Sequence, residues 1–356
     1  MKPAAFLAEY PGRLCLLLIL TAAVIPISCS TEFNVNAPFV ERPIIWGLLD
    51  AKDSLHYLRI QRTFQTDGPA ENGAADPEKI HYPAGALEVE LQELVEGSIS
   101  RSWFARRVDG NLIDRVKDDG LFATNPNVLY EIDAQLLQEL DYRLMVRHLE
   151  SEKEYEAETS LVGDFDSFFP IQPDFAIDFA DTGKFKVQWL SAEMGFLYDA
   201  WYELGYVEYE PGGSDTSYEA ARYPMFQNVT FSAGEPFTIL ETNITNLGFY
   251  TGLSRVLEEP EGTRVRDFRS LHINFGAGGE NLYLLYLNSL ANLGITELFI
   301  SPYYTNIDGG ALGILGSRST VRSAPVLLTP STLDSLACGR FTEDLGFLAS
   351  NGSSCP

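Results

Sequence analysis

The 356-residue chain carries 50 acidic and 25 basic residues, which gives a formal net charge of −25. This balance argues against nucleic-acid binding, which needs clustered Lys and Arg to neutralise phosphates, and against a body that lies flat on anionic lipid. A hydrophobic fraction of 45%, with 12% aromatic residues, excludes a disordered chain because it is enough to bury real cores.

The N-terminus has the pattern of an export signal. A basic lead precedes an apolar run over residues 14–25, and the small Ser28 stands directly before Cys29. Such a run is typical of a secretory signal and not of a membrane-spanning helix. The pattern resembles a bacterial lipoprotein signal, although Pro26 stands where that pattern has Leu. The resemblance implies that residues 1–28 are removed and that acyl chains such as palmitate on Cys29 anchor the protein. The alternative is a plain signal peptide, which leaves Cys29 as an ordinary thiol.

After a polar tether over residues 29–42, short alternating segments predict a first domain over residues 43–163. Strict alternation of apolar and polar residues is typical of half-buried strands. The predicted strands cover residues 44–49, 56–64, 87–94, 102–108, 129–132, 142–149 and 155–162. Because six or seven short strands with turns between them favour an immunoglobulin-like β-sandwich, we expect that fold, in the form that lacks a core disulfide.

Residues 164–183 are irregular and are predicted to be a linker between two domains. They contain five aspartates, at positions 164, 166, 174, 178 and 181. Calcium favours oxygen-rich sites, but the EF-hand spacing is absent, so the pattern indicates a solvated acidic linker.

Strands and helices alternate over residues 184–337, which predicts an antiparallel α+β domain with two helices. Its predicted strands cover residues 184–190, 196–209, 237–242, 265–275, 298–300 and 326–328, and its helices residues 249–259 and 281–293. We expect a polar loop between residues 209 and 237 and a single helical turn over residues 331–336. The domain therefore combines a sheet with helices that interrupt it.

The strand over residues 196–209 is rich in aromatic side chains. Its alternation places Trp201 and Tyr209 on one face, and Tyr198, Tyr202 and Tyr206 on the other. At least one face must then be buried. The other is a candidate platform for a sugar or a peptide.

The C-terminal tail, residues 338–356, contains the cysteine pair Cys338 and Cys355. An even pair in an exported protein predicts a disulfide, which would tie down a tail rich in Gly, Ser and Asn. No Cys-x-x-Cys pair is present, so a zinc site is not expected.

A Gly-rich stretch over residues 309–318 lacks the Lys-Ser or Lys-Thr of a phosphate loop, so we expect an irregular loop there. Loops held by a rigid sheet commonly carry binding residues. The candidate binding residues beside this stretch are Tyr303, Tyr304, Asn306 and Asp308.

No catalytic motif stands out in the sequence. There is no Gly-x-Ser-x-Gly elbow, and the four histidines, at positions 56, 81, 148 and 272, fall in no metal motif. We therefore expect a binding or scaffold protein without cofactor or metal. The alternative is an envelope hydrolase of glycans or peptides.

Three patches resemble an uncharacterised family of Bacteroidota outer-membrane lipoproteins. They are residues 45–49 with 57–60, residues 142–146 with 157–159, and residues 305–310. The resemblance implies an outer-membrane location and an accessory role beside a TonB-dependent receptor or another outer-membrane barrel. The segments around Ser54 and Ser335 resemble the O-glycosylation sites of these bacteria.

Overall fold

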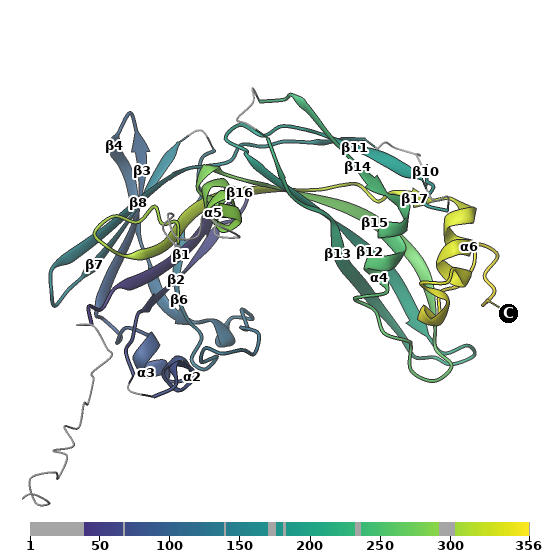
Figure 1. The fold of residues 1–356 in the computed structure, drawn as a ribbon, viewed down its shortest axis with the longest axis horizontal. Coiled ribbons are helices and arrows are strands. Elements are labelled where there is room, and N and C mark those ends of the chain that lie inside the picture. The colour runs from purple at the N-terminus through teal and green to yellow at the C-terminus, as the bar shows by residue number, and fades with distance from the viewer. Residues whose placement is uncertain are drawn as a thin grey trace, which may run out of the picture. The chain divides into compact units, whose positions relative to one another are not determined.

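The computed structural model describes residues 39–66, 68–138, 140–169, 176–180, 183–231, 236–291 and 303–355, with the side chains of residues 167–169 and 291 left out. The export signal, Cys29, most of the tether and the predicted strand over residues 298–300 lie outside the described residues. The described chain is mainly β, with antiparallel sheets and a smaller share of helix (Figure 1).

The largest sheet has eight strands. In spatial order they are β13 (Thr216–Thr230), β12 (Leu197–Tyr209), β15 (Val265–Gly278), β16 (Leu312–Arg322), β1 (Pro43–Leu49), β2 (Leu55–Arg62), β6 (Val128–Asp133) and β5 (Arg106–Asp109). All neighbours in it are antiparallel except β1 and β16, which are parallel.

Three smaller sheets complete the β structure of the described residues. One contains β4 (Ser98–Phe104), β3 (Leu87–Val95), β7 (Asp141–His148) and β8 (Lys153–Ser160); the others pair β14 (Ile239–Thr245), β11 (Lys184–Leu190) and β9 (Ser167–Phe169), and β10 (Ala176–Ile177) with β17 (Leu327–Leu328). The helices are α2 (Ala70–Ala74), α3 (Pro77–Ile80), α4 (Asn246–Leu253), α5 (Glu280–Ala291) and α6 (Pro330–Cys338), with 3-10 turns at Gly110–Leu112 and Glu343–Leu345.

Two hydrophobic cores stabilise the fold. The first lies between the β1, β2 and β6 strands and the four-stranded sheet, and its buried side chains include Ile45, Leu58 and Leu144. The second is largely aromatic: Trp189 and Phe249 are fully buried, each with several aromatic rings around it. Each core collects the apolar faces of strands that alternate in sequence, which is why the alternation predicted the strands.

The structure corrects the predicted separation of two domains at residues 164–183. Strand β16 pairs with β1 through residues 312–317 and with β15 through residues 318–322, so one sheet includes strands from both predicted domains. Leu315 of β16 belongs to the first core. The sequence did not reveal this connection, because β1 and β16 are far apart in the chain and their parallel pairing leaves no periodic signal in either segment.

Most short strands of the first half follow the predicted pattern. The strand pairs β1–β2, β3–β4 and β7–β8 form antiparallel hairpins. The single strand predicted over residues 102–108 is divided between β4 and β5, which belong to different sheets. Two expectations in the second half are wrong. The predicted polar loop contains the long strand β13, and the predicted Gly-rich loop forms most of strand β16.

The helices differ from the prediction in extent and number. Helix α4 begins three residues earlier than expected and ends at Leu253, and α5 starts one residue earlier than expected. The single turn expected over residues 331–336 is the nine-residue helix α6, which Thr329 caps by accepting a hydrogen bond from the Thr332 N–H. No described helix has both the length and the apolar character needed to span a bilayer.

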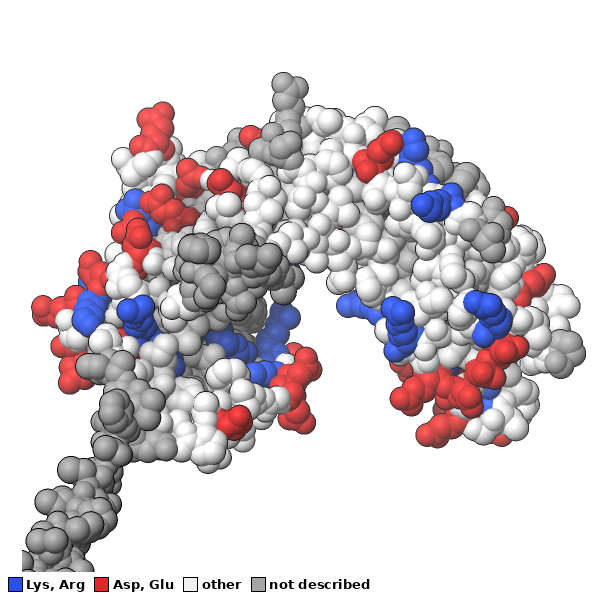
Figure 2. All heavy atoms as spheres, in the orientation of Figure 1, with Lys and Arg blue, Asp and Glu red and all other residues white. Residues whose placement is uncertain are grey.

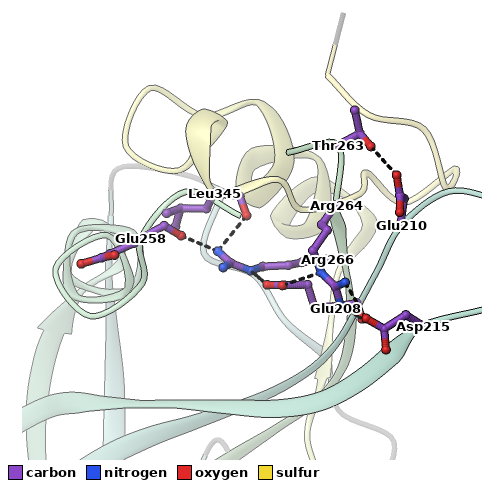
Figure 3. A network of polar contacts seen from close by, with 8 residues as sticks. All are labelled: Glu208, Glu210, Asp215, Glu258, Thr263, Arg264, Arg266 and Leu345. Carbon is purple, nitrogen blue, oxygen red and sulfur yellow. Dashed lines mark hydrogen bonds and ion pairs between the residues drawn. The ribbon is translucent and has the colours of Figure 1, made fainter. Parts of the chain in front are cut away.

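The C-terminal segment is attached to the end of helix α6 and to the sheet. Cys338 and Cys355 form a disulfide with a Cα–Cα distance of 5.3 Å, as the sequence predicts. The second attachment is Arg266, whose Nη1 donates to the carbonyls of Glu258 (2.7 Å) and Leu345 (3.1 Å), while its Nε donates to Glu208 (2.8 Å; Figure 3). Arg264 binds the other oxygen of the same Glu208 carboxylate at 2.9 Å. This buried guanidinium is therefore paired with a charge and satisfied by carbonyls.

The parallel pairing depends on one glycine. Gly313 has a φ of +106°, and a Cβ there would overlap the carbonyl oxygen of Ile45 on the neighbouring strand. Gly310 also has a positive φ, of +85°, but a Cβ there would meet nothing within 4 Å. A side chain at Gly310 would therefore meet backbone strain alone, whereas a side chain at Gly313 would meet both backbone strain and a steric clash.

We expect Gly313→Ala to lower the free energy of unfolding by more than about 3 kcal/mol, because it adds a clash between strands to the strain of a positive φ. Gly310→Ala should cost only about 1 to 2 kcal/mol, from the strain alone. Urea unfolding of both variants measures the difference. Equal losses in the two variants would contradict the role given to the β1–β16 contact.

Candidate functional site

A groove lies on the face of the large sheet that points away from the aromatic core. In β12, Tyr198, Tyr202 and Tyr206 are buried. Trp201, on the opposite face, lines the groove with Glu203. The predicted division of the aromatic residues between two faces is therefore confirmed for these four residues.

The groove has a volume of about 500 Å³ and crosses four neighbouring strands. It is lined by Trp201, Glu203, Arg222, Asn274, Arg318, Thr320, Val321 and Arg322. A second hollow of about 420 Å³ shares Thr320, Val321 and Arg322 with it and adds Lys52, Asp164, Phe165, Asp166 and Phe237. Together they form a hollow within the size range of small-molecule sites.

Three arginines give the groove its positive character. Arg222 Nε lies 3.0 Å from one oxygen of Glu203, and Arg322 Nη2 lies 2.6 Å from the other. Glu203 is largely buried, whereas the side chains of Arg222 and Arg322 are 69% and 57% exposed. One carboxylate therefore holds two guanidinium groups in place, and each keeps donors that face solvent.

The centre of the groove combines an aromatic ring with a buried amide. Trp201 is paired in register with Asn274 and lies over Gly276, where a Cβ would come within 3.4 Å of its ring. Asn274 is almost completely buried, and its Nδ2 has no hydrogen-bond partner within the part of the chain that the structure describes. The site thus offers a flat apolar surface with hydrogen-bond donors around it.

The third arginine reaches toward a carboxyl at the end of β1. Arg318 Nε lies 3.6 Å from Asp50, which is 3% exposed and accepts a hydrogen bond from the Lys52 N–H at 3.0 Å. Burial raises the pKa of Asp50 above its ordinary value of 3.8, with Asp53 adding to the rise, while the Lys52 N–H, Arg318 and the Lys52 side chain oppose it. Asp50 therefore positions Arg318 at a cost in desolvation.

The predicted binding residues beside the Gly-rich stretch lie away from this groove, in the segment before β16. Asn306 accepts a hydrogen bond from the Leu315 N–H at 3.0 Å and donates to the carbonyls of Leu315 and Glu158, at 2.8 and 3.1 Å. Tyr304 donates to Asn281 at 2.9 Å, and the Asp308 N–H donates to the Glu156 carbonyl at 2.7 Å. Tyr303 is 54% exposed. Asn306 and Asp308 thus attach the segment before β16 to β8, and ligand binding by these residues stays a prediction.

The sequence patterns did not identify the arginines of the groove. Arg318 and Arg322 stand at even spacing in β16, which is the one signal of a shared face, but the surrounding glycines led us to expect a loop. Trp201 was found because its strand alternates. Among the described residues, no three His, Cys, Asp or Glu side chains are arranged to hold a metal ion.

The comparisons with known proteins leave the groove without a precedent. No protein-family model matches the chain, and no curated protein matches it significantly. Any function must therefore be argued from the residues themselves.

Asp50 provides a test of the electrostatics at the edge of the groove. Since its pKa is higher in the folded than in the unfolded chain, its contribution to stability is complete below pH 3.8 and is lost as the pH rises through the folded value. Asp50→Asn, which stays neutral, should therefore gain stability relative to the native chain between pH 3 and pH 7. Urea unfolding across this range, with the exposed Asp133→Asn as control, measures the change. A constant difference between Asp50→Asn and the native chain would contradict the assignment.

Proposed function

We propose that this protein is an envelope binding protein that captures an acidic saccharide in the groove. The observation that carries the proposal is the placement of Arg222, Arg318 and Arg322 around Trp201 in a chain whose net charge is −25. Acidic residues outnumber basic ones by 50 to 25 and are prominent on the visible surface (Figure 2). A site with three cations is therefore a local reversal of the protein's general charge.

The chemistry of the groove favours a sugar acid over a neutral sugar or a bare ion. Guanidinium groups bind carboxylates through paired, charge-assisted hydrogen bonds. A tryptophan ring offers a flat apolar surface on which the C–H face of a pyranose can pack. An inorganic ion has no apolar face and would gain nothing from contact with this ring. The unpartnered Nδ2 of Asn274 adds a donor for a hydroxyl or a carboxylate.

The groove favours binding over hydrolysis. Glycoside hydrolases generally use two carboxyl groups, one of which donates a proton to the leaving oxygen. Among the described residues that line the 500 Å³ groove, Glu203 is the one carboxylate, and both of its oxygens are already engaged by arginines. Asp164 in the adjoining hollow is paired with Lys52 at 3.1 Å. The arrangement of Glu203 suits a residue that positions Arg222 and Arg322, and we propose that role for it.

We also propose that the protein is an acylated outer-membrane lipoprotein, anchored by Cys29 and associated with an outer-membrane barrel such as a TonB-dependent receptor. The pattern at residues 14–29 supports the anchor, and the resemblance of residues 45–49 and 57–60 to Bacteroidota lipoproteins supports the location. We propose further that the first core belongs to an immunoglobulin-like sandwich, since side chains from two sheets enclose it.

Binding of a galacturonic acid trimer, measured by calorimetry, tests the groove. We expect Trp201→Ala and Arg322→Gln each to weaken binding at least tenfold. Trp201→Ala removes the stacking surface, and Arg322→Gln removes a guanidinium group that would bind the carboxylate of the sugar. The matched controls are Trp46→Ala and Arg269→Gln, which change an exposed tryptophan and an exposed, ion-paired arginine outside the lining of the groove. A neutral galactose trimer should bind far more weakly than the acid.

Failure of the acidic trimer and of other uronic acid oligomers to bind would overturn the proposed ligand class. Equal loss in a control variant and its groove counterpart would place the binding elsewhere on the surface.

The anchor is tested separately. Cys29→Ala should move the protein from the membrane fraction to the soluble fraction, because a chain with this charge has little affinity of its own for anionic lipid. Fractionation followed by immunoblotting measures the shift, with Cys338→Ala as a cysteine control. Tight retention of Cys29→Ala in the membrane would defeat the anchor.

A further inference from the structure

A second group of cations lies on the other part of the sheet, around β2. It consists of Arg59 on β2, Arg107 on β5, and Lys117 in the segment between β5 and β6. Within the described ranges, none of these three forms an ion pair with a carboxylate, although the chain has twice as many acidic as basic residues. Three such cations near one another need an explanation.

Several buried polar atoms in this group have no partner. Arg59 Nη2 donates to Asn127 Oδ1 at 2.8 Å, but its Nη1 is buried and has no acceptor among the described residues. Gln61 Nε2 also has no acceptor among them, and neither ring nitrogen of His81, a residue that is only 5% exposed, has a hydrogen-bond partner there. Arginine and amide nitrogens only donate, so what is missing here is a hydrogen-bond acceptor.

The electrostatics around His81 agree with an excess of positive charge. Burial, followed by the charges of Arg107, Arg59 and Lys117 in that order, lowers the pKa of His81 to about 4, while the Pro126 carbonyl acts in the other direction. Burial also lowers the pKa of Arg59. The pKa of Lys117 is lowered by burial and, after that, by the positive charge of Arg59. A local anion would counter all of these shifts.

The contrast with Arg266 shows how this protein treats a buried arginine elsewhere. Arg266 is almost fully buried, more so than the half-buried Arg59, and it binds the Glu208 carboxylate and two carbonyl oxygens (Figure 3). A guanidinium nitrogen that is buried without an acceptor destabilises the folded chain. Arg59, left with one amide oxygen, lacks the compensation that Arg266 has.

An apolar hollow of about 270 Å³ adjoins the cations. Its walls include Ile44, Gln61, Phe64, Ile80, Leu121 and Phe122. Gln61 lines this hollow and is also one of the residues with an unpartnered nitrogen. His81 directly follows Ile80 in the sequence. Lys117 Nζ lies 5.6 Å from the centre of the Phe122 ring. Leu121 and Phe122 are about half exposed, so the hollow opens to solvent.

We propose that Arg59, Gln61, His81 and Lys117 form a second binding site, which takes the oxoanion group of a small organic acid whose apolar part lies in this hollow. The acid group supplies an acceptor for the unpartnered nitrogens of Arg59 and Gln61 and for the ring N–H of His81. It also supplies a negative charge opposite Lys117, whose Nζ donates to the carbonyls of Phe122 and Ala123, both at 3.1 Å. The hollow supplies apolar contact. The site shares no lining residue with the groove around Trp201 and does not depend on the function proposed for that groove.

Calorimetry on the mature protein with four probes tests this site. Benzoate and phenyl phosphate carry a ring and an oxoanion, inorganic phosphate lacks the ring, and benzyl alcohol lacks the charge. We expect saturable binding of at least one ring-bearing anion, at least tenfold tighter than inorganic phosphate and benzyl alcohol. The preference between benzoate and phenyl phosphate identifies the oxoanion as carboxylate or phosphate.

Two variants separate binding from structure. Arg59→Met and Lys117→Met should each weaken binding of the preferred probe at least tenfold. Arg59→Met should keep or raise the thermal stability of the free protein, because it removes an uncompensated charge. Lys117→Met also removes two hydrogen bonds to the carbonyls of Phe122 and Ala123, so its stability is not expected to rise. The matched control Lys79→Met, on the exposed side of the neighbouring helix α3, should change neither quantity.

Two results would overturn the proposal. One is the absence of saturable binding by both ring-bearing anions. The other is a loss of thermal stability in both variants with unchanged affinity for the probe, since that would make the cations structural. Inorganic phosphate that binds as tightly as phenyl phosphate would remove the apolar part of the proposed ligand.

Discussion

The parallel pairing of β1 with β16 is the constraint on which the rest of this structure depends. It joins residues 44–49 to residues 312–317, so almost the whole described chain closes as one loop between them. The entropy cost of closing so long a loop grows only slowly with its length, and burial of Ile45, Leu49 and Leu315 offsets it. The same strand continues into its pairing with β15 and carries Arg318 and Arg322 into the groove. The first core and the groove are therefore connected by a single strand.

Local patterns in the sequence predicted the parts of the fold that depend on local contacts. The three hairpins and the two faces of β12 follow from alternation, because each pairs with a neighbour in sequence or buries one face. Strand β16 escaped prediction because its special features are those of a loop. Gly313 is needed where the backbone of β1 comes close, and Ser317 and Ser319 are small polar residues that are buried. Small residues permit close packing of two backbones, but in a sequence they are also typical of a flexible loop.

The groove could be predicted only in part, for a related reason. Trp201, Arg222 and Arg322 stand on three strands, and their meeting depends on the order β13-β12-β15-β16. A strand order is set by non-local pairing, which one sequence does not reveal. The site around Arg59 was harder still to predict, since an arginine at a polar position of an alternating strand normally faces water. Its significance appears only when the structure shows that no carboxylate of the described chain is paired with it.

The treatment of arginine differs between three places, and the differences suggest which of them bind ligands. Arg266 has a carboxylate and carbonyls for its donors and shows what a structural arginine needs in this protein. Arg222 and Arg322 share one carboxylate and keep donors in solvent, which suits a groove that is open before a ligand arrives. Arg59 is half-buried and donates to one amide oxygen, while its buried Nη1 has no acceptor among the described residues, an arrangement that costs stability unless an anion completes it. Incomplete compensation of buried charge is thus a physical signal of a binding site, because a folded chain keeps such a cost only where something outside the chain removes it.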